Sequence, residues 1–329
     1  MMKKSIRYVI YSLFIMQLTG CKVDFNPNAE WKDIPVVYCL LDQDDDTTWV
    51  RVQKCYLGED NLNAYMQISD SINYPEGAIQ VKMLQKSNGV VSREFEFEYT
   101  LRHDKLPGQF ASVEQPLYAC RTKGQLVDDA DYELLVIKGS DTIARSTTNL
   151  IYGDYHLYEP NSAFSHEFKF RTGICNVEWA SLNNARLYQP VVRFFYKSWG
   201  DTLFVDIPCV SKLVQRNQER FSIQIQQNTY MNDLKTALQS DTSRKKFVDF
   251  VEIFINACTE DLNAYMASQY SGTSVTQNQQ IYSNIQGGLG IFSARRLHLS
   301  TMVPCDSTTG TASNMSYRDL IRSLDVGFE

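Results

Sequence analysis

The segment from residue 78 to residue 101 constrains the fold most, because its apolar and polar residues alternate with the period of a β-strand. Its first half, 78–85, is followed by Asn88-Gly89, the strongest short-range signal for a two-residue hairpin turn. Its second half has large apolar residues on one face and glutamates on the other: Phe95, Phe97, Tyr99 and Leu101 against Glu94, Glu96 and Glu98. The segment therefore predicts an antiparallel hairpin with one buried face and one charged, solvated face.

Comparable patterns recur along the chain and predict a mainly β protein. Further strands are expected at 34–42, 48–56, 131–138, 174–179, 187–196, 202–207, 220–226 and 247–255. The first two are expected to form a hairpin around an acidic turn, and 174–179 is expected to pair with 187–196. Pro190 predicts an edge position or a bulge, because proline lacks the N–H that a central strand donates. The strand 247–255 is apolar on both faces and is expected to be central.

The length of 329 residues favours about two domains, which we expect at 31–150 and 151–329. The sequence DADYELLV at 129–136 resembles the strand of immunoglobulin-like sandwiches in which a tyrosine caps a corner. The spacing of Trp179, Tyr188 and Val192 resembles a fibronectin type III sandwich. We therefore expect two immunoglobulin/fibronectin-like β-sandwich domains, the second decorated with short helices.

Three stretches of the second half have apolar residues at helical spacing, around 230–238, 262–266 and 317–324. The last of them follows Ser316-x-x-Asp319, the pattern of a capping box. The apolar stripes are expected to be core contacts, with a surface docking role as the alternative for the last helix.

The N-terminus predicts a lipoprotein signal peptide at 1–20 and a tether at 21–30. A basic start is followed by an apolar run at 8–18, which is too short for the ~20 residues of a membrane span. Leu18-Thr19-Gly20-Cys21 resembles the bacterial lipobox, which implies cleavage before Cys21 and acylation (as with palmitate) of its thiol and amine. The alternative is an ordinary signal peptide that ends at a chance cysteine. Lys rather than Asp follows Cys21, which favours the outer membrane.

Seven cysteines remain after Cys21: Cys39, Cys55, Cys120, Cys175, Cys209, Cys258 and Cys305. The number is odd, so at least one thiol stays free or pairs with another chain. Cys39 and Cys55 belong to one expected hairpin and are candidates for near neighbours. We expect at most two disulfide bridges.

The residues that carry chemistry form no convincing constellation. The histidines at 103, 156, 166 and 298 lack the spacing of zinc ligands, and the aspartates at 42, 44, 45 and 46 suit a solvated turn better than a Ca²⁺ loop. The glutamates at 94, 96 and 98 suit a charged sheet face better than the paired carboxylates of a glycosidase. The sequence Gly287-Gly288-Leu289-Gly290 suits a turn better than a ligand-binding loop. We expect no catalytic, metal or cofactor-binding residues and no cofactor. The net charge of −6 also disfavours a nucleic-acid partner.

Several motifs together resemble the Bacteroidota lipoprotein family numbered 4249 among domains of unknown function. They are the lipobox, the opening 36–41 with its Asp-rich turn, Pro75-Glu-Gly-Ala78, and 282–285 with 288–292. The resemblance implies an outer-membrane lipoprotein of two β-sandwich domains, often encoded beside TonB-dependent transporters. Only Cys21 carries over from it, as the lipid attachment site.

These observations favour a non-enzymatic binding or interaction protein, lipid-anchored in the outer membrane and accessory to a TonB-dependent transporter or surface assembly. Its expected partners are the membrane, through acyl chains on Cys21, and an outer-membrane β-barrel protein. The alternatives are a structural surface or adhesion subunit, and a glycan- or peptide-acting enzyme with a site between the domains. The sequence leaves open which side of the membrane the protein faces.

Overall fold

A computed structural model of the chain describes residues 34–55, 68–104, 114–160, 167–215, 218–241, 243–270, 282–306 and 315–328. The predicted signal peptide, the tether and the lipid attachment site Cys21 lie outside these residues. The chain is mainly β, as predicted. None of the helices within the described ranges combines the length and apolar character needed to cross a membrane.

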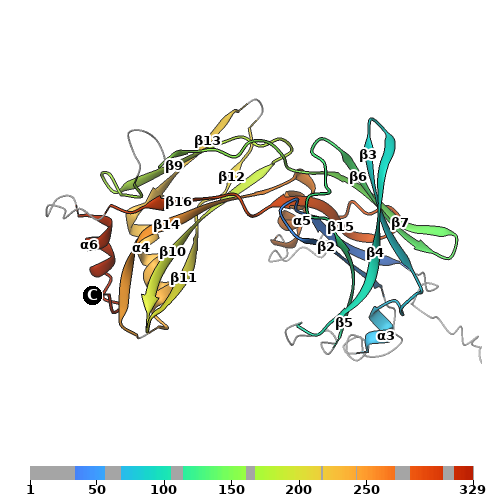
Figure 1. Ribbon diagram of the computed structural model, residues 1–329, viewed down its shortest axis with the longest axis horizontal. Helices are drawn as coiled ribbons and strands as arrows, with labels where there is room; N and C mark the ends of the chain where they lie inside the picture. Colours follow the sequence, from blue (N-terminus) through green and yellow to red (C-terminus); the bar gives the residue numbers. More distant parts are fainter. Residues whose placement is uncertain are drawn as a thin grey trace, which may run out of the picture.

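The molecule has two lobes that lie side by side along its long axis (Figure 1). The first lobe contains one short helix and eight strands: β1 (Pro35–Leu41), β2 (Thr47–Lys54), α3 (Ser69–Ile72), β3 (Gln80–Ser87), β4 (Val90–Arg102), β5 (Gln115–Arg121), β6 (Asp131–Lys138), β7 (Asp141–Asn149) and β15 (Leu289–Arg296). The second lobe contains most of the later elements: β8 (Leu157–Glu159), β9 (Ile174–Ala180), β10 (Leu187–Ser198), β11 (Asp201–Pro208), β12 (Lys212–Leu213), β13 (Arg220–Gln226), α4 (Gln227–Leu238), β14 (Lys245–Cys258), β16 (Ser300–Pro304) and α6 (Tyr317–Arg322). The helix α5 (Glu260–Tyr270) lies where the lobes meet.

One continuous sheet passes through both lobes in the order β11-β10-β14-β15-β1-β2-β5-β4-β3-β6-β7. Its link is β15, which runs parallel to β1 over six residue pairs but meets β14 at only two. A separate sheet of three strands, in the order β13-β9-β8, belongs to the second lobe. Each lobe buries its own hydrophobic core beside these sheets.

The strand β15 belongs to the first core although it follows the second lobe in the sequence. Ile285, Phe292 and Ala294 pack with residues of β1 to β7, and Gln286 bridges to Arg145 of β7. The sequence predicts one domain at 151–329, whereas packing divides this range between the two cores. The chain leaves the second lobe, completes the first, and returns as β16.

The glycines before and within β15 allow this insertion. A Cβ atom on Gly290 would lie 2.0 Å from the carbonyl oxygen of Val37, and Gly290 has a φ of +108°. A Cβ atom on Gly288 would lie 2.5 Å from the oxygen of Pro35. The sequence predicted a turn here, but the main role of the glycines is close backbone approach to β1, because no other residue lacks the Cβ atom.

The predicted hairpins are confirmed. Asn88 and Gly89 have φ values of 52° and 78°, the paired positive angles of a type I′ turn, between the antiparallel strands β3 and β4. The glutamates of β4 are exposed, and Lys82 on the neighbouring strand forms ion pairs with Glu94 and Glu96 at 2.6 and 3.1 Å. The strands β1 and β2 also pair as expected.

The predicted pairing of 174–179 with 187–196 is wrong. The strand β9 pairs with β13 and β8 in the small sheet, and it faces β10 across the second core. Trp179 makes that contact, with its ring centroid 5.5 Å from the ring of Tyr188. Both strands are strongly apolar on one face. This pattern is the same whether two strands pair side by side in one sheet or face each other across a core.

The edge position predicted from Pro190 is also wrong, because β10 lies between β14 and β11. The backbone N–H of Cys209 donates to the Pro190 oxygen, so the proline nitrogen faces residues 209–211, where β11 has ended and β12 has not begun. No ladder donor is needed at that point. The register irregularity of β10 is instead at Phe194/Tyr196.

The helices α4 and α6 confirm the predicted core stripes, whereas α5 does not, because Leu262 and Met266 line a cavity and no described α5 residue joins either core. In α4 the buried residues are Tyr230, Met231, Leu234 and Leu238. In α6 the Ser316 hydroxyl accepts from the backbone N–H of Asp319 at 3.1 Å, and Tyr317, Leu320 and Ile321 are buried. The apolar face of α6 therefore packs against the core, which leaves no basis for the alternative of a surface docking role for this helix.

Candidate interaction surface

The outer face of the second lobe's large sheet is unusually apolar. A sheet that covers a core on one side usually shows polar residues on the other. Here five large apolar residues gather around Arg193 and its neighbours Asp206 and Glu252. We call this group the aromatic face: Arg193, Phe195, Phe204, Phe250, Phe254 and Met302. Phe204 and Met302 are each 52% exposed. Such a patch on a protein surface is typical of an interaction site.

The strand register brings these side chains together. Phe195 of β10 is directly opposite Phe204 of β11, and their ring centroids are 6.2 Å apart. The Phe250 ring of β14 lies 5.2 Å from Phe195 on the other side. Met302 of β16 pairs with Glu252, between the two phenylalanines of β14. The patch thus crosses four adjacent strands.

Arg193 holds a fixed position in the middle of the aromatic face. Its guanidinium carbon lies 4.1 Å from the ring centroid of Phe204 and 4.6 Å from that of Phe254. Its Nε and Nη2 atoms donate to the two carboxylate oxygens of Asp206 at 2.7 and 2.9 Å. The hydrogen bonds to Asp206 raise the pKa of Arg193. The stacked, bidentate arginine is therefore charged and preorganised.

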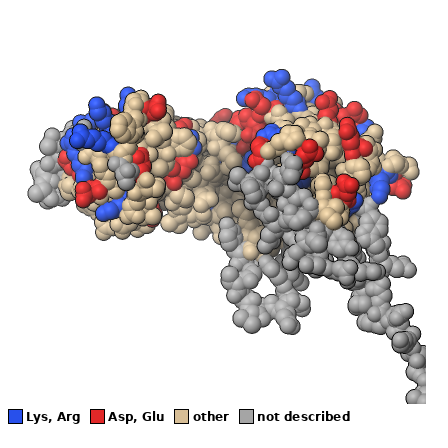
Figure 2. Space-filling model, turned by 90° about the horizontal axis from the view of Figure 1, so that it is seen from below, with Lys and Arg blue, Asp and Glu red and all other residues tan. Residues whose placement is uncertain are grey.

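The same outer face continues into a cavity of about 250 Å³ between the lobes. Leu187, Gln189 and Asn256 line it from the sheet, and Leu262 and Met266 line it from α5. Seen from below, charged side chains gather on the two outer parts of the molecule, and the part between them is mostly uncharged (Figure 2). The aromatic face and the cavity lie on the same side of the sheet, away from the second core.

The acidic turn between β1 and β2 packs against the connection from β15 to β16. Asp42 is only 1% exposed, and its carboxylate accepts from the backbone N–H groups of Leu297 and Asp44 at 3.0 and 3.1 Å. Arg296 forms an ion pair with Asp44 at 3.2 Å. Burial raises the pKa of Asp42. The prediction of a solvated turn is therefore wrong for Asp42, because the turn lies in the junction between the lobes.

Three groups at this junction come close enough for one cation. One ligand atom from each of Asp42, Asp45 and His298 lies within 4.8 Å of the others. His298 Nε2 is 3.1 Å from Asp45, and Asp46 points elsewhere and pairs with Lys123 at 2.9 Å. The carboxylates of Asp42 and Asp45 also have protein partners, which join the acidic turn to residues 295–298.

His103 and His156 do not join this cluster. The ring of His156 contacts Tyr158 with centroids 4.5 Å apart, and His103 is exposed at the end of β4. His166 lies outside the described residues.

All seven cysteines after Cys21 are free thiols, including the candidate neighbours Cys39 and Cys55. Burial raises the pKa of Cys175 and Cys209 to about 12 and that of Cys258 to about 11. These thiols are protonated at neutral pH and are poor nucleophiles.

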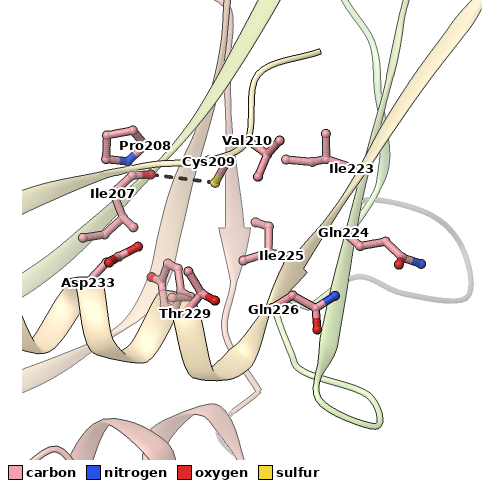
Figure 3. A pocket seen from close by; sticks show the side chains of 11 residues that line it. Ile207, Pro208, Cys209, Val210, Ile223, Gln224, Ile225, Gln226, Thr229 and Asp233 are labelled. Carbon is pink, nitrogen blue, oxygen red and sulfur yellow. Dashed lines mark hydrogen bonds between the residues drawn. The ribbon is translucent and has the colours of Figure 1, made fainter.

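A second, smaller pocket opens where β13, α4 and the end of β11 meet (Figure 3). Its volume is about 110 Å³. Ile207, Val210, Ile223 and Ile225 provide its apolar wall, and Asp233 of α4 lies at its side. Cys209 in its wall donates weakly to the carbonyl oxygen of Ile207. The pocket thus offers apolar contacts and one carboxylate.

In comparisons with known proteins, no protein-family model and no curated protein matches the chain.

Sequence reasoning missed the aromatic face, although its signal was present. The strand 247–255 is apolar on both faces, a pattern that predicts a central strand covered on both sides. In the fold β14 is central within its sheet, but the described residues cover only one side of it with core. The apolar residues on the second face of β14 are therefore the sequence signal of an apolar surface.

Proposed function

We propose that this chain is a lipid-anchored outer-membrane interaction protein, and that it binds an outer-membrane β-barrel protein such as a TonB-dependent transporter through the aromatic face. The observation that carries the proposal is the cluster around Arg193 on a sheet face, in which Phe204 and Met302 are exposed and the other three phenylalanines are half-buried. Aromatic residues, methionine and arginine are enriched in protein interfaces, and aromatic residues and arginine dominate their energetic centres. A preorganised Arg193 loses little side-chain entropy when a partner binds.

The anchor is part of this proposal. Acyl chains on Cys21 would hold the protein at the membrane, next to partners embedded in it. Substitution of Cys21 by Ala tests this directly: the variant is expected to lose the acyl mass and to leave the membrane fraction. Unchanged mass and unchanged membrane partitioning would refute the lipid anchor, whatever the aromatic face does.

We also propose that the two lobes are immunoglobulin/fibronectin-like sandwiches and that the chain belongs to the lipoprotein family numbered 4249. A tyrosine-capped corner in each lobe supports the fold. The Tyr132 hydroxyl accepts from the N–H of Val127 at 2.7 Å, and the Tyr188 hydroxyl accepts from the N–H of Leu182 at 2.7 Å. The motifs at 36–41 and 282–292 support the family.

The experiment compares two glutamate substitutions at exposed apolar positions. Phe204→Glu puts a charge into the aromatic face, and Val90→Glu puts one on the first lobe's hairpin, where the side chain is 70% exposed. A tagged chain is extracted in mild detergent, and stoichiometric co-purification of a heat-modifiable β-barrel protein is measured.

We expect wild type and Val90→Glu to retain the barrel partner and Phe204→Glu to lose it, with circular dichroism unchanged in all three. A contact at the centre of an interface costs more than about 1 kcal/mol when removed, so recovery falls about fivefold or more. The proposal fails if Phe204→Glu retains the partner, or if wild type recovers only itself. Recovery of further copies of this chain would instead favour a structural subunit.

A further inference from the structure

The small sheet of the second lobe ends in a strand whose outer edge is free. The strand β13 pairs with β9 and with no other strand among the described residues. An edge strand offers unpaired backbone groups to any extended segment of suitable register.

The ends of the β9–β13 ladder fix the direction of the backbone groups. The N–H of Ser181 donates to Glu219, and the N–H of Gln227 donates to Gly173. Glu219 and Gln227 flank β13 at odd-numbered positions, and antiparallel ladders alternate in steps of two. The N–H and C=O groups of the even-numbered residues Ser222 and Gln224 therefore point away from β9, toward the free edge.

The pocket of about 110 Å³ lies on the inner side of this edge (Figure 3). Ile223 and Ile225 of β13 form one wall, and Ile207 and Val210 form the other. Val210 is 73% exposed at the pocket, although valine is apolar. The volume is well below the roughly 300–1,000 Å³ of small-molecule sites, and it suits a single branched aliphatic side chain.

The outer side of the same edge borders a different surface. A polar groove of about 610 Å³ runs over the outer face of the small sheet, and Ser222 and Gln224 are in its lining. Lys169, Arg171 and Glu178 supply charge along it. A strand added to β13 would thus meet an apolar pocket on one face and a polar groove on the other, which matches the alternation of a β-strand.

We propose that the free edge of β13 binds an extended peptide segment of a partner protein by strand addition. The bound segment alternates apolar and polar residues, with one leucine, isoleucine or valine side chain in the pocket between β13 and β11. A basic residue two positions along the segment, on the same face, lies near Asp233. Backbone hydrogen bonds with Ser222 and Gln224 supply affinity, and the pocket supplies selectivity. The inference is separate from the aromatic face and goes beyond the proposed function.

The probe is a set of fluorescent ten-residue peptides of alternating threonine and leucine with one lysine, together with a copy in which glycine replaces leucine. Binding to the full-length, detergent-purified protein is measured by fluorescence anisotropy. Hydrogen exchange of the Ser222 and Gln224 amides is measured with and without peptide. We expect saturable binding of the leucine peptides, no binding of the glycine copy, and slowed exchange at both amides.

Two variants test the edge and the pocket. Gln224→Pro removes one edge donor and leaves the ladder to β9 intact, because prolines are tolerated where the N–H faces away from a sheet. Val210→Asp puts a charge at the pocket, and Val90→Asp is the matched control on the other lobe. Each of the first two is expected to weaken binding about tenfold, as the loss of one hydrogen bond or one apolar contact does, and the control is expected to bind like wild type.

Equal affinity of all variants, or no saturable binding of any leucine peptide to wild type, would overturn the proposal. So would concentration-dependent dimers that Gln224→Pro abolishes, because the edge would then be occupied by a second copy. Loss of the β-barrel partner in Phe204→Glu tests the aromatic face and does not depend on peptide binding at β13. The two proposals can therefore fail separately.

Discussion

Replacement of Gly290 by alanine is predicted to damage the first lobe more than the change of one methyl group suggests. The new Cβ atom would lie 2.0 Å from the Val37 oxygen, 2.9 Å from its carbonyl carbon and 3.0 Å from its nitrogen. All three are backbone atoms of β1, which pairs with β15 at this position. Neither strand can move away without breaking the parallel ladder.

The expected cost has two parts. A φ of +108° in a residue with a Cβ atom costs about 1–3 kcal/mol, and overpacking that shifts backbone costs about 1–3 kcal/mol more. The sum, about 2–6 kcal/mol, is a large share of the roughly 5–15 kcal/mol that stabilises a typical protein. The matched control is Gly89→Ala, since Gly89 has a φ of +78° with no atom within 4 Å of the new Cβ position. It carries only the conformational cost of about 1–2 kcal/mol.

The measurement is urea unfolding followed by circular dichroism and by tryptophan fluorescence. Gly290→Ala is expected to lower the free energy of unfolding by at least twice as much as Gly89→Ala. Equal losses in the two variants would mean that Gly290 does not lie against Val37, and the insertion of β15 beside β1 would then be refuted.

Three further changes test other contacts. Tyr132→Phe removes the hydroxyl that accepts from the Val127 N–H at 2.7 Å, and a loss of about 1–3 kcal/mol is expected in thermal unfolding; a neutral result would contradict the corner. Lys245→Met is expected to lower the melting temperature by several degrees, because the buried ammonium donates to three carbonyl oxygens, including Val326 at 3.0 Å; unchanged stability would show that these oxygens find other partners. Burial raises the pKa of Asp42 above its unfolded value of about 3.9, so the folded state binds the extra proton and wild-type stability falls as pH rises through that window. Asp42→Asn, measured by urea unfolding between pH 3 and pH 8, should gain stability relative to wild type as pH rises and then level off; a constant difference would refute this.

Strand positions were predictable because alternation is a local property of the chain. The β3–β4 hairpin needs only Asn88-Gly89 and its flanks, and β6 begins and ends where its pattern does. Pairing between distant strands was not predictable in the same way. The period of two marks which face of β9 is buried, but it does not say whether the partner lies beside the strand or across a core.

The candidate surfaces were hidden for related reasons. Apolar residues on both faces of β14 have the same sequence pattern whether a second layer covers them or not. The acidic turn gave no sign of burial, because its partners Arg296 and Leu297 lie about 250 residues later. The pocket beside β13 combines residues from β11, β13 and α4, and no linear motif joins them.

The insertion of β15 also determines the order in which the molecule can assemble. Val36 pairs with Leu289, so the first lobe has nearly all of its strands early in synthesis but lacks one until most of the chain has been made. Until then the edge of β1 that later receives β15 is open, and such edges favour misassociation during folding. Contacts this distant in sequence also slow folding, since a long loop must close before they form. The lobe that is made first therefore stays incomplete until most of the second lobe has been made, and a chain cut before residue 289 cannot finish either the sheet or the join between the lobes.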